Sequence, residues 1–434
     1  MSGGSTKTKR KSEITVPDQN PTAASAGQII AVSNAPPHVP HSLIWDLDYA
    51  RFLRDFDDPF VAGCRLHTGP DIVWATRMNR GEAGWLITRH ALMEEILMDY
   101  ENFSAARSDL KPLLGYDIRF YPLDCDPPVH HRFRQTIAPI FTPAAVKRLD
   151  SSIRSICHEL IGQFGGRENC EFIAEFSSVF PNYVFLELIG MPRDMLPQFL
   201  AWNEDFQRGE GMVRVTAARA ILAYLQGFLS EQRNNADRTD LMELMLGGRE
   251  GLEPLDDDEA LGMTYMLYVA GLDTVYSTTG WIMKHLATDQ QLQDRLRNCP
   301  ADIPRAIDEL TRAYSVSTTT RLVSRDLEFH GISMKAGDTV FMPLYLATRD
   351  DQLFADPHRI DIERRSRHLT FGAGAHICLG FHLAKRELAI VVETLLDRYS
   401  SITLKEGWHY HSEGPVLGLD TLPLHWTLAQ NRKE

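Results

Sequence analysis

The feature that most constrains the fold is a stretch from Asp257 to Thr288 that keeps a helical pattern without a proline. At 1.5 Å per residue, such a helix would be about 45 Å long. The acidic residues at 256–259 suit its N-terminal end, where the helix dipole is positive. We therefore expect one long central helix.

The middle of this helix, YVAGLDTVYST, departs from its apolar character. Ala270 and Gly271 are small, and Asp273 and Thr274 are polar. Glycine and threonine are unfavourable inside a helix. A local violation of this kind in an otherwise apolar element often marks a functional site, so residues 270–274 are candidates for one.

Most of the remaining sequence also favours helix. Apolar residues recur at helical spacing in residues 150–164 and 217–234, and Thr288 with Gln291 predicts a capping box for a helix that stops at Pro300. Short strands are indicated at residues 72–77, 83–89, 321–344 and 422–428. The sequence contains no internal repeat and no GxGxxG fingerprint. We predict a mainly α fold with small β-sheets.

The composition bounds the organisation of the chain. It has 434 residues, of which 44% are hydrophobic, and this is enough for a large core. Residues 1–40 are rich in Ser, Thr, Pro, Ala and Gly, so we predict a disordered arm there and a single folded domain at residues 41–434. The basic cluster at residues 7–11 is either a functional tail or, as we expect, part of a plain solvated terminus.

Charge and cysteine usage disfavour several function classes. The formal net charge of −13 argues against nucleic acid and anionic membrane as partners. No apolar run is long enough to span a bilayer and the N-terminus lacks a signal core, so a cytoplasmic protein is expected. The six cysteines form no CxxC pair, which argues against zinc and thioredoxin-type sites.

One cysteine has an unusual setting, the segment HLTFGAGAHICLGFHLAKREL at residues 368–388. Gly372, Gly374 and Gly380 permit backbone shapes closed to other residues and let a flat, bulky group approach. Cys378 is either an inert buried side chain, as we expect for the other five cysteines, or a ligand.

Three motifs together resemble the cytochrome P450 family. FGAGAHICLG matches the haem-binding loop Phe-Gly-x-Gly-x-His/Arg-x-Cys-x-Gly, ELTR at residues 309–312 resembles the E-x-x-R pair, and AGLDT resembles the oxygen-activating helix. They occur in the family order, and the resemblance runs from about residue 41 to the C-terminus. It implies the P450 fold, with haem b between the long central helix and the cysteine loop, and makes residues 41–434 one catalytic domain.

The resemblance gives the loop residues their roles. Cys378 would be the axial ligand of the haem iron, because a thiolate donates electron density that favours O–O cleavage. Phe371, Gly372 and Gly380 would shape the loop against the haem, with amide hydrogens aimed at the sulfur.

Glu309 and Arg312 lie at i and i+3, where opposite charges on a helix meet. Such a pair is usually a surface ion pair that contributes little. The family pattern instead makes it a buried structural pair beneath the haem.

The two haem propionates need cations. His130 and Arg134 match the family element H-x-x-x-R, and Arg321 and His376 fall at its other propionate positions. Arginine suits a carboxylate because its donors form a fork. The alternative for each of the four is an ordinary surface charge, and we favour the haem role. Thr319 replaces an acid that the family has near Arg321, so we expect a looser network.

Asp273 and Thr274 resemble the acid–alcohol pair of the family. The reaction consumes two protons, and the Thr274 hydroxyl and the Asp273 carboxyl would deliver them. Thr274 could also bond back to a helix carbonyl, and both can be true. Ala270 and Gly271 would leave room for oxygen beside the haem.

Further segments, among them LEFHGISMKAGD and GLDTLPLHW, look like the bacterial camphor hydroxylase group. That group receives electrons from a 2Fe–2S ferredoxin and an NAD(P)H-dependent flavin ferredoxin reductase, and no reductase is fused here. An acidic ferredoxin would dock on a basic face. Unless they are plain solvated charges, the residues that would form this face are His131, Arg132, Arg134, Arg364, Arg365, Arg367, Lys385 and Arg386.

The substrate pocket departs from the camphor group, in which a tyrosine binds the substrate ketone. The matching position is Ile118, and Tyr116 lies two residues earlier. A mostly apolar lining implies a small hydrophobic substrate of the terpenoid or norisoprenoid type. The expected lining residues, each of which could also be plain core, are Tyr116, Ile118, Phe120, Leu123, Met266, Val269, Ala270, Val316, Ser317, Pro415 and Val416.

These features predict a haem-thiolate monooxygenase that inserts one atom of O2 into a C–H bond and reduces the other to water. A non-catalytic haem-thiolate binding or sensor protein is the first alternative, and it would have no need of Asp273 and Thr274. Thr274→Ala separates the two, because only a monooxygenase would then release peroxide while still consuming NADH. A helical scaffold without haem is the second, and it would lack the thiolate-type Soret band of the reduced carbon monoxide complex.

Overall fold

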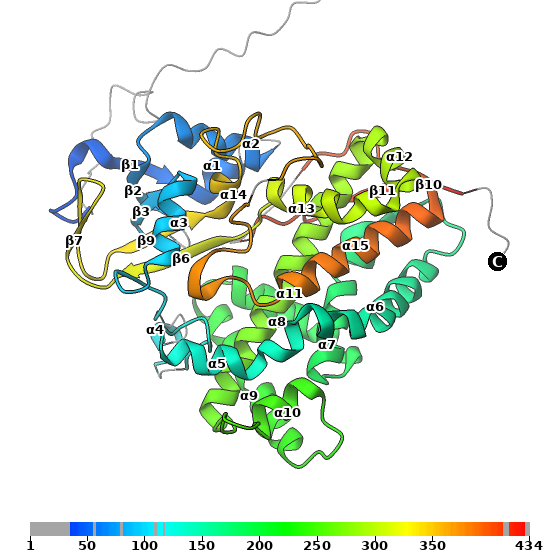
Figure 1. Cartoon of the computed structure of the whole chain (residues 1–434), viewed down its shortest axis with the longest axis horizontal. Helices are drawn as coiled ribbons and strands as arrows, with labels where there is room; N and C mark the ends of the chain where they lie inside the picture. The colour runs from blue at the N-terminus through cyan, green and yellow to red at the C-terminus, as the bar shows by residue number, and fades with distance from the viewer. Residues whose placement is uncertain are drawn as a thin grey trace, which may run out of the picture.

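The computed structural model describes residues 35–54, 58–78, 81–107, 111–115, 118–365, 367–410 and 416–429. The larger sheet lies on one side of the molecule and most of the helices lie on the other (Figure 1). This is the predicted mainly α fold with small sheets. None of the helices in these ranges is long and apolar enough to cross a membrane.

The helices fall into a longer and a shorter set. The longer ones are α3 (His90–Met98), α5 (Val129–Ile137), α6 (Pro143–Gln163), α7 (Phe180–Ile189), α8 (Leu196–Arg208), α9 (Gly211–Arg233), α11 (Asp257–Thr288), α12 (Gln290–Asn298), α13 (Ile303–Ala313) and α15 (Phe381–Arg398). The shorter ones are α1 (Tyr49–Arg54), α2 (Pro59–Gly63), α4 (Lys111–Leu114), α10 (Asp240–Leu246) and α14 (Leu344–Thr348).

The central helix α11 has the predicted bounds. A capping box starts it: the Asp256 side chain accepts from the Glu259 amide, and the Glu259 carboxylate accepts from the Asp256 amide. Glu259 also binds Arg132 of α5 at 2.9 Å. The helix packs against α7, α9, α13 and α15, which explains why its sequence is apolar on most sides.

The predicted start of the next helix is wrong by one residue. Asp289, not Thr288, caps α12, and its side chain accepts from the Leu292 amide at 2.9 Å. The Thr288 hydroxyl donates instead to the His285 carbonyl of α11 at 2.8 Å. Because the Thr288 hydroxyl is bonded to the preceding helix, Asp289 caps α12 instead.

The larger sheet is mixed, and it carries one of the site residues. Its order is β1 (Ile44–Asp48), β2 (Ile72–Arg77), β3 (Gly84–Ile87), β9 (Thr339–Pro343), β6 (Thr318–Val323) and β4 (Phe103–Ser104). A second sheet joins β10 (Tyr399–Leu404), β11 (Pro423–Leu428) and β5 (Asn169–Glu171), and β7 (Leu327–Phe329) pairs with β8 (Ile332–Met334). In β6, Arg321 stands opposite Val340 of β9, so the sheet fixes its position.

The packed part of the chain begins before the predicted boundary at residue 41. Val39 is buried, and the His38 imidazole lies 2.8 Å from the Asp338 carboxylate. Asp338 also accepts from the Trp85 indole at 2.9 Å. Residues 35–40 are therefore part of the folded domain, and residues 1–34 of the predicted arm lie outside the described residues.

Candidate active site

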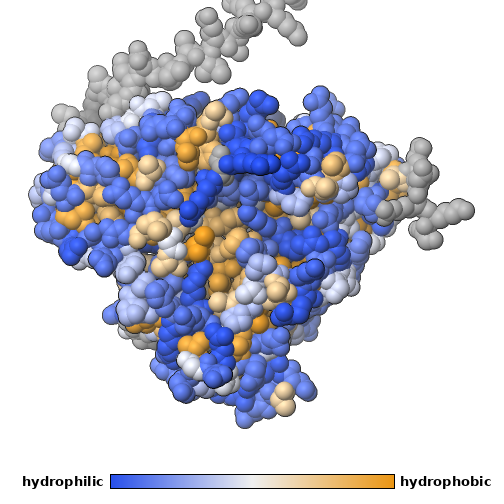
Figure 2. Space-filling model, in the orientation of Figure 1, coloured by the Kyte–Doolittle hydropathy of each residue, from blue (hydrophilic) through white to orange (hydrophobic). Residues whose placement is uncertain are grey.

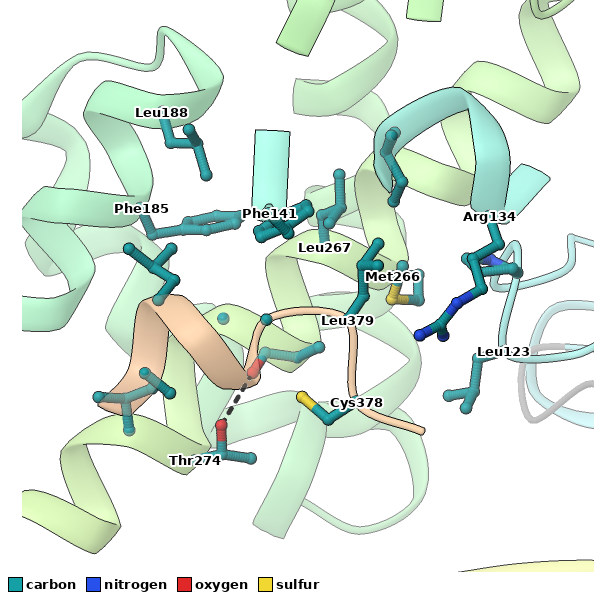
Figure 3. A pocket seen from close by; sticks show the side chains of 18 of the residues that line it. Leu123, Arg134, Phe141, Phe185, Leu188, Met266, Leu267, Thr274, Cys378 and Leu379 are labelled. Carbon is teal, nitrogen blue, oxygen red and sulfur yellow. Dashed lines mark hydrogen bonds between the residues drawn. The ribbon is translucent and has the colours of Figure 1, made fainter. Parts of the chain in front are cut away.

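A cavity of about 290 Å³ lies between α5, α11, α15 and the loop that carries Cys378. Figure 3 shows Phe141, Phe185 and Leu188 in one part of its wall, Leu123 and Arg134 in another, and the sulfur of Cys378 directed into the space. In Figure 2, apolar residues gather in a hollow near the middle of the molecular face. The cavity is thus an apolar space with charged groups at one end.

Two glycines shape the cysteine loop, residues 371–380. Gly372 and Gly374 have φ angles of +71° and +68°, in the left-handed region that favours glycine. A Cβ on Gly374 would lie 2.4 Å from the carbonyl oxygen of Leu97, so only glycine lets the loop approach α3 this closely. The Cys378 amide donates to the Phe371 carbonyl at 2.8 Å and closes the loop.

The surface that Cys378 exposes is part of the cavity wall. Burial raises the pKa of its thiol, whereas the Gly380 amide, which donates to the sulfur, and the Arg134 guanidinium lower it. An amide directed at this sulfur is what the sequence predicted. Both groups favour the thiolate, which is the form that binds a metal.

Three basic side chains line one end of the cavity: His130 and Arg134 on α5, and His376 in the loop. Arg321 on β6 lines a neighbouring cavity, and it lies close enough to lower the pKa of both histidines. The rings of His130 and His376 lie 4.3 Å apart. Both ring nitrogens of His130 and Nε2 of His376 are buried without a partner among the described residues. Burial, with the nearby arginines, lowers the pKa of His130 to about 4 and that of His376 to about 3.

This basic cluster, in which Arg134 and Arg321 carry the positive charge, is suited to anions. Arg321 is buried, and its guanidinium donates to the Thr320 carbonyl at 2.7 Å and lies 3.4 Å from the Thr319 hydroxyl. Burial lowers the pKa of Arg321 to about 10. The arginines lower the pKa of both histidines, and an anion between them would offset this effect and stabilise the protonated imidazoles. The apolar space, the thiol and this cluster therefore fit a haem with its two propionates.

Helix α11 forms another wall, to which Ala270, Gly271 and Thr274 contribute. The Thr274 hydroxyl donates to the Ala270 carbonyl at 3.2 Å, the dashed line in Figure 3, so the back-bonded alternative is the observed one. A Cβ on Gly271 would lie 2.7 Å from the Phe185 ring. The contact between α7 and α11 therefore requires a glycine at position 271. This requirement is independent of the predicted role of Gly271 in leaving room for oxygen.

Asp273 lies behind the cavity wall rather than in it. Its carboxyl is buried, accepts a hydrogen bond from Tyr276 and faces Arg208 at the end of α8. Burial raises the pKa of this carboxyl, and the tyrosine and the arginine oppose that rise. The acid–alcohol pair thus connects the α8 side of α11 with the cavity.

Glu387 on α15 lines the cavity and was missed in the sequence analysis. It is 3% exposed, and Oε2 has no partner within the described part of the chain. Burial raises its pKa well above the usual range and so favours the protonated carboxyl. Its only sequence signal is a place on the apolar face of an amphipathic helix.

The predicted substrate pocket is divided between two cavities. Leu123, Met266 and Ala270 line the first, and Phe120, Leu123 and Val269 line a second one of about 220 Å³. Ile118, Val316, Ser317 and Val416 line neither of them. Tyr116 and Pro415 lie outside the described residues.

The second cavity is more polar than the predicted lining. Hydroxyls come from Thr318, Thr319 and Thr320 of β6, and longer polar side chains come from Gln207 of α8 and Arg214 of α9. The Arg214 guanidinium lies 5.1 Å from the centre of the Phe206 ring. No motif marks α8 and α9, so these side chains could not be predicted from the sequence.

Glu309 and Arg312 of α13 form a buried pair, 4% and 1% exposed. Two hydrogen bonds of 2.7 and 2.8 Å join the guanidinium to the carboxylate. Arg312 also donates to the carbonyls of Thr348 and Pro357, at 2.7 and 3.1 Å. The pair fastens α13 to the chain that leads into the cysteine loop.

Much of the predicted basic face is neutralised within the molecule. The pairs are Arg132 with Glu259, Arg364 with Glu309, Lys385 with Asp308, and Arg386 with Asp150 and Glu393. His131, Arg365 and Arg367 remain exposed. The positive charge on offer to a partner is therefore smaller than the residue types suggest.

Comparisons with known proteins place these features in one family. The family model described as cytochrome P450 matches residues 194–298 and 303–426. The chain is 33% identical over 374 residues to the probable cytochrome P450 127A1 of Sinorhizobium fredii, covering 85% of this chain and 90% of the relative. It is 31% identical over 362 residues to the mycinamicin IV hydroxylase/epoxidase of Micromonospora griseorubida, covering 80% of this chain and 90% of that relative.

Solved structures resemble the whole fold. The crystal structure of CYP101J2 matches with a TM-score of 0.81 at 27% identity, over 91% of this chain and 100% of that one. The crystal structure of cytochrome P450 CYP101C1 matches with a TM-score of 0.80 at 29% identity, over 90% and 99%.

Proposed function

The chain belongs to the cytochrome P450 family, whose members carry haem b on a cysteine thiolate, and we propose that Cys378 is the axial ligand here. The observation that carries the proposal is one cavity that joins the Cys378 thiol to the basic side chains of His130, Arg134 and His376. As a P450 monooxygenase, the protein uses substrate, O2, two electrons and two protons to make hydroxylated substrate and water. When bound, the haem supplies the oxygen-activating chemistry.

His130, Arg134, Arg321 and His376 would hold the propionates. The unpartnered ring nitrogens of the two histidines can donate to carboxylate oxygens, and the arginines add forked donors. Thr319 brings no charge to Arg321, and the acid that acts on this guanidinium is Asp126. Phe371, Gly372 and Gly380 would complete the support around Cys378.

Thr274 and Asp273 would manage the protons. The Thr274 hydroxyl lies in the wall and can exchange its bond to Ala270 for one toward the cavity. The Asp273 carboxyl, whose pKa is raised by burial, can pass protons from the α8 side. Asp273 and Thr274 together would form the route by which protons enter the cavity.

The substrate we propose is a small hydrophobic molecule of the terpenoid or norisoprenoid type. Leu123, Met266 and Val269 supply apolar walls. The hydroxyls of β6 and the polar groups of α8 and α9 favour a molecule that also carries an oxygen atom. Titration of the ferric protein with camphor, followed at the Soret band, is the first screen, with less polar terpenoids next.

We further propose a 2Fe–2S ferredoxin, reduced by an NAD(P)H-dependent flavin reductase, as the electron donor. The motif resemblance to the camphor hydroxylase group supports it, as do the exposed Arg365 and Arg367 beside the cysteine loop. Most other cations of the predicted face are paired within the molecule. The rate at which ferredoxin encounters this protein should therefore depend on Arg365 and Arg367 more than on the other cations.

The test is turnover under ¹⁸O2 with a ferredoxin, its reductase and a substrate found in the spectral screen. Mass spectrometry is expected to find one ¹⁸O atom per product molecule. Product oxygen that comes from water, or consumption of electrons by the haem protein without any product across the panel, would overturn the proposal.

A further inference from the structure

Asp308 of α13 is not part of any motif described above, yet it holds the two ends of the cysteine loop. Its Oδ1 lies 3.4 Å from His368 Nε2, just before the loop, and 2.5 Å from Lys385 Nζ, in the helix that follows the loop. One carboxylate oxygen therefore bridges the entry and the exit of the segment that presents Cys378.

Both partners of Asp308 also flank Phe371. The ring centres of His368 and Phe371 are 6.3 Å apart, and Lys385 Nζ lies 5.3 Å from the centre of the Phe371 ring. The Phe371 carbonyl accepts from the Cys378 amide at 2.8 Å. A continuous series of contacts thus runs from Asp308 to the backbone of Cys378.

This arrangement differs from an ordinary surface ion pair. The His368 side chain is only 6% exposed, although Asp308 and Lys385 are 44% and 33% exposed. His368 first, and then Lys385, hold the pKa of the Asp308 carboxyl well below its usual range, so it stays ionised across the working pH range. A charged acceptor with one buried donor keeps its geometry better than two solvated side chains do.

We propose that Asp308 is a positioning residue, which ties the entry and the exit of the cysteine loop together and so keeps the Cys378 sulfur directed at the haem iron. Asp308, His368 and Lys385 form what we term the loop clamp. The inference rests on the proposed role of Cys378 as the axial ligand.

The experiment compares haem-loaded variants by the ferrous carbon monoxide spectrum. Asp308→Asn, Lys385→Gln and the double variant are warmed, and the rate at which the thiolate-type Soret band is lost is recorded. Asp294→Asn is the matched control, because Asp294 is an exposed acid that pairs with Arg297 at i,i+3 on α12. We expect each clamp variant to lose the band about three to ten times faster than wild type, and the control to match wild type.

The reduction potential of the haem separates the clamp from a simple charge effect. Asp308→Asn leaves Lys385 uncompensated and should raise the potential, because a nearby positive charge stabilises the reduced form. Lys385→Gln leaves Asp308 uncompensated and should lower it. The double variant is neutral at both positions, so its potential should return close to that of wild type while its band is still lost rapidly.

Loss of the band at the wild-type rate in Asp308→Asn would overturn the proposal. So would a double variant that regains both potential and band stability, since charge balance alone would then explain the data. If Asp308→Asn fails to take up haem, Lys385→Gln and His368→Gln remove one arm each and give the same comparison. A wild-type protein without a thiolate-type band would instead overturn the proposed function, and the clamp with it.

Discussion

The two sides of the cavity are built in different ways. On the loop side, Cys378 stands on a braced segment: Gly374 presses against α3, and the buried pair of Glu309 and Arg312 fastens the chain that leads there. On the α11 side, Thr274 is held by one bond within its own helix. The loop side fixes a position, whereas the α11 side keeps polar groups that can change partners.

This contrast separates stability from chemistry. A substitution on the loop side should cost folding free energy or cofactor retention, because it breaks contacts between distant segments. A substitution on the α11 side should leave the fold intact and change what happens to protons. The following predictions test that division, from the largest expected effect to the smallest.

Arg312→Leu should lower the free energy of unfolding by about 3–5 kcal/mol, because the buried Glu309 carboxylate would lose two short hydrogen bonds and keep the longer contact with Arg364. Urea unfolding followed by circular dichroism measures this. Arg77→Leu is the control, since its pairs with Asp46 and Asp48 are largely exposed and should contribute less than about 1 kcal/mol. Equal losses in the two variants would contradict the bracing role of α13.

His130 should make the haem-free protein sensitive to acid. Its pKa is about 4 in the folded state, below the ordinary value of about 6.5. Between these values the unfolded chain binds a proton that the folded chain does not, so stability is full above about pH 6.5 and falls as the pH drops toward 4. The loss should reach about 3 kcal/mol at about 1.4 kcal/mol per pH unit.

The measurement is urea unfolding as a function of pH for wild type and His130→Gln. The variant should lose this part of the acid sensitivity. Bound haem should also reduce it, because a propionate beside the imidazole would raise the His130 pKa toward its ordinary value. If the free energy of unfolding has the same pH dependence in wild type and variant, His130 is not part of the basic cluster.

Thr274→Ala should change chemistry far more than stability. The fraction of NADH electrons that ends in product should fall about tenfold, with peroxide released instead, because the cavity loses its hydroxyl. The free energy of unfolding should change by less than about 1.5 kcal/mol, which is the usual net contribution of one hydrogen bond. A sensor protein would show no such change in electron use.

Thr278→Ala is the matched control for this substitution. Thr278 makes the same back-bond one turn later, to the Thr274 carbonyl at 2.9 Å, and does not line the cavity. It should match wild type in the yield of product per NADH. Equal uncoupling by both variants would assign the effect to helix bending rather than to the hydroxyl.

The smallest effect is expected at the surface. Gln substitutions at Arg365 and Arg367 should raise the KM for ferredoxin about threefold at low salt and have no effect at high salt, because exposed charges act by screened attraction. The pair can be compared with Lys147→Gln and Arg148→Gln, which remove two exposed cations of α6. An effect that persists at high salt would point to apolar docking.

The sequence predicted the elements and motifs that are continuous in the chain. The bounds of α11 followed from a long run without proline, and the cysteine loop from glycines within a few residues of Cys378. The cap of α12 was misassigned because Thr288 and Asp289 are both good capping residues, and only the bond of Thr288 to its own helix decides between them.

What the sequence did not predict depends on contacts between distant segments. Glu387 is an ordinary acid until its helix packs and leaves its Oε2 without a partner among the residues that the structure describes. The polar lining from Gln207 and Arg214 arises where α8 and α9 meet β6. Similarly, the basic residues beside the loop read as a docking face because their acidic partners, such as Asp150 and Asp308, lie far away in the sequence.

The most direct test of the central claim is the absorption spectrum of the purified, reduced protein under carbon monoxide. A cavity that presents the Cys378 thiolate to haem iron predicts the strongly red-shifted Soret band of a thiolate complex, and Cys378→Ser should abolish it. A band typical of histidine ligation, or no haem at all, would contradict the assignment of Cys378 and the function built on it.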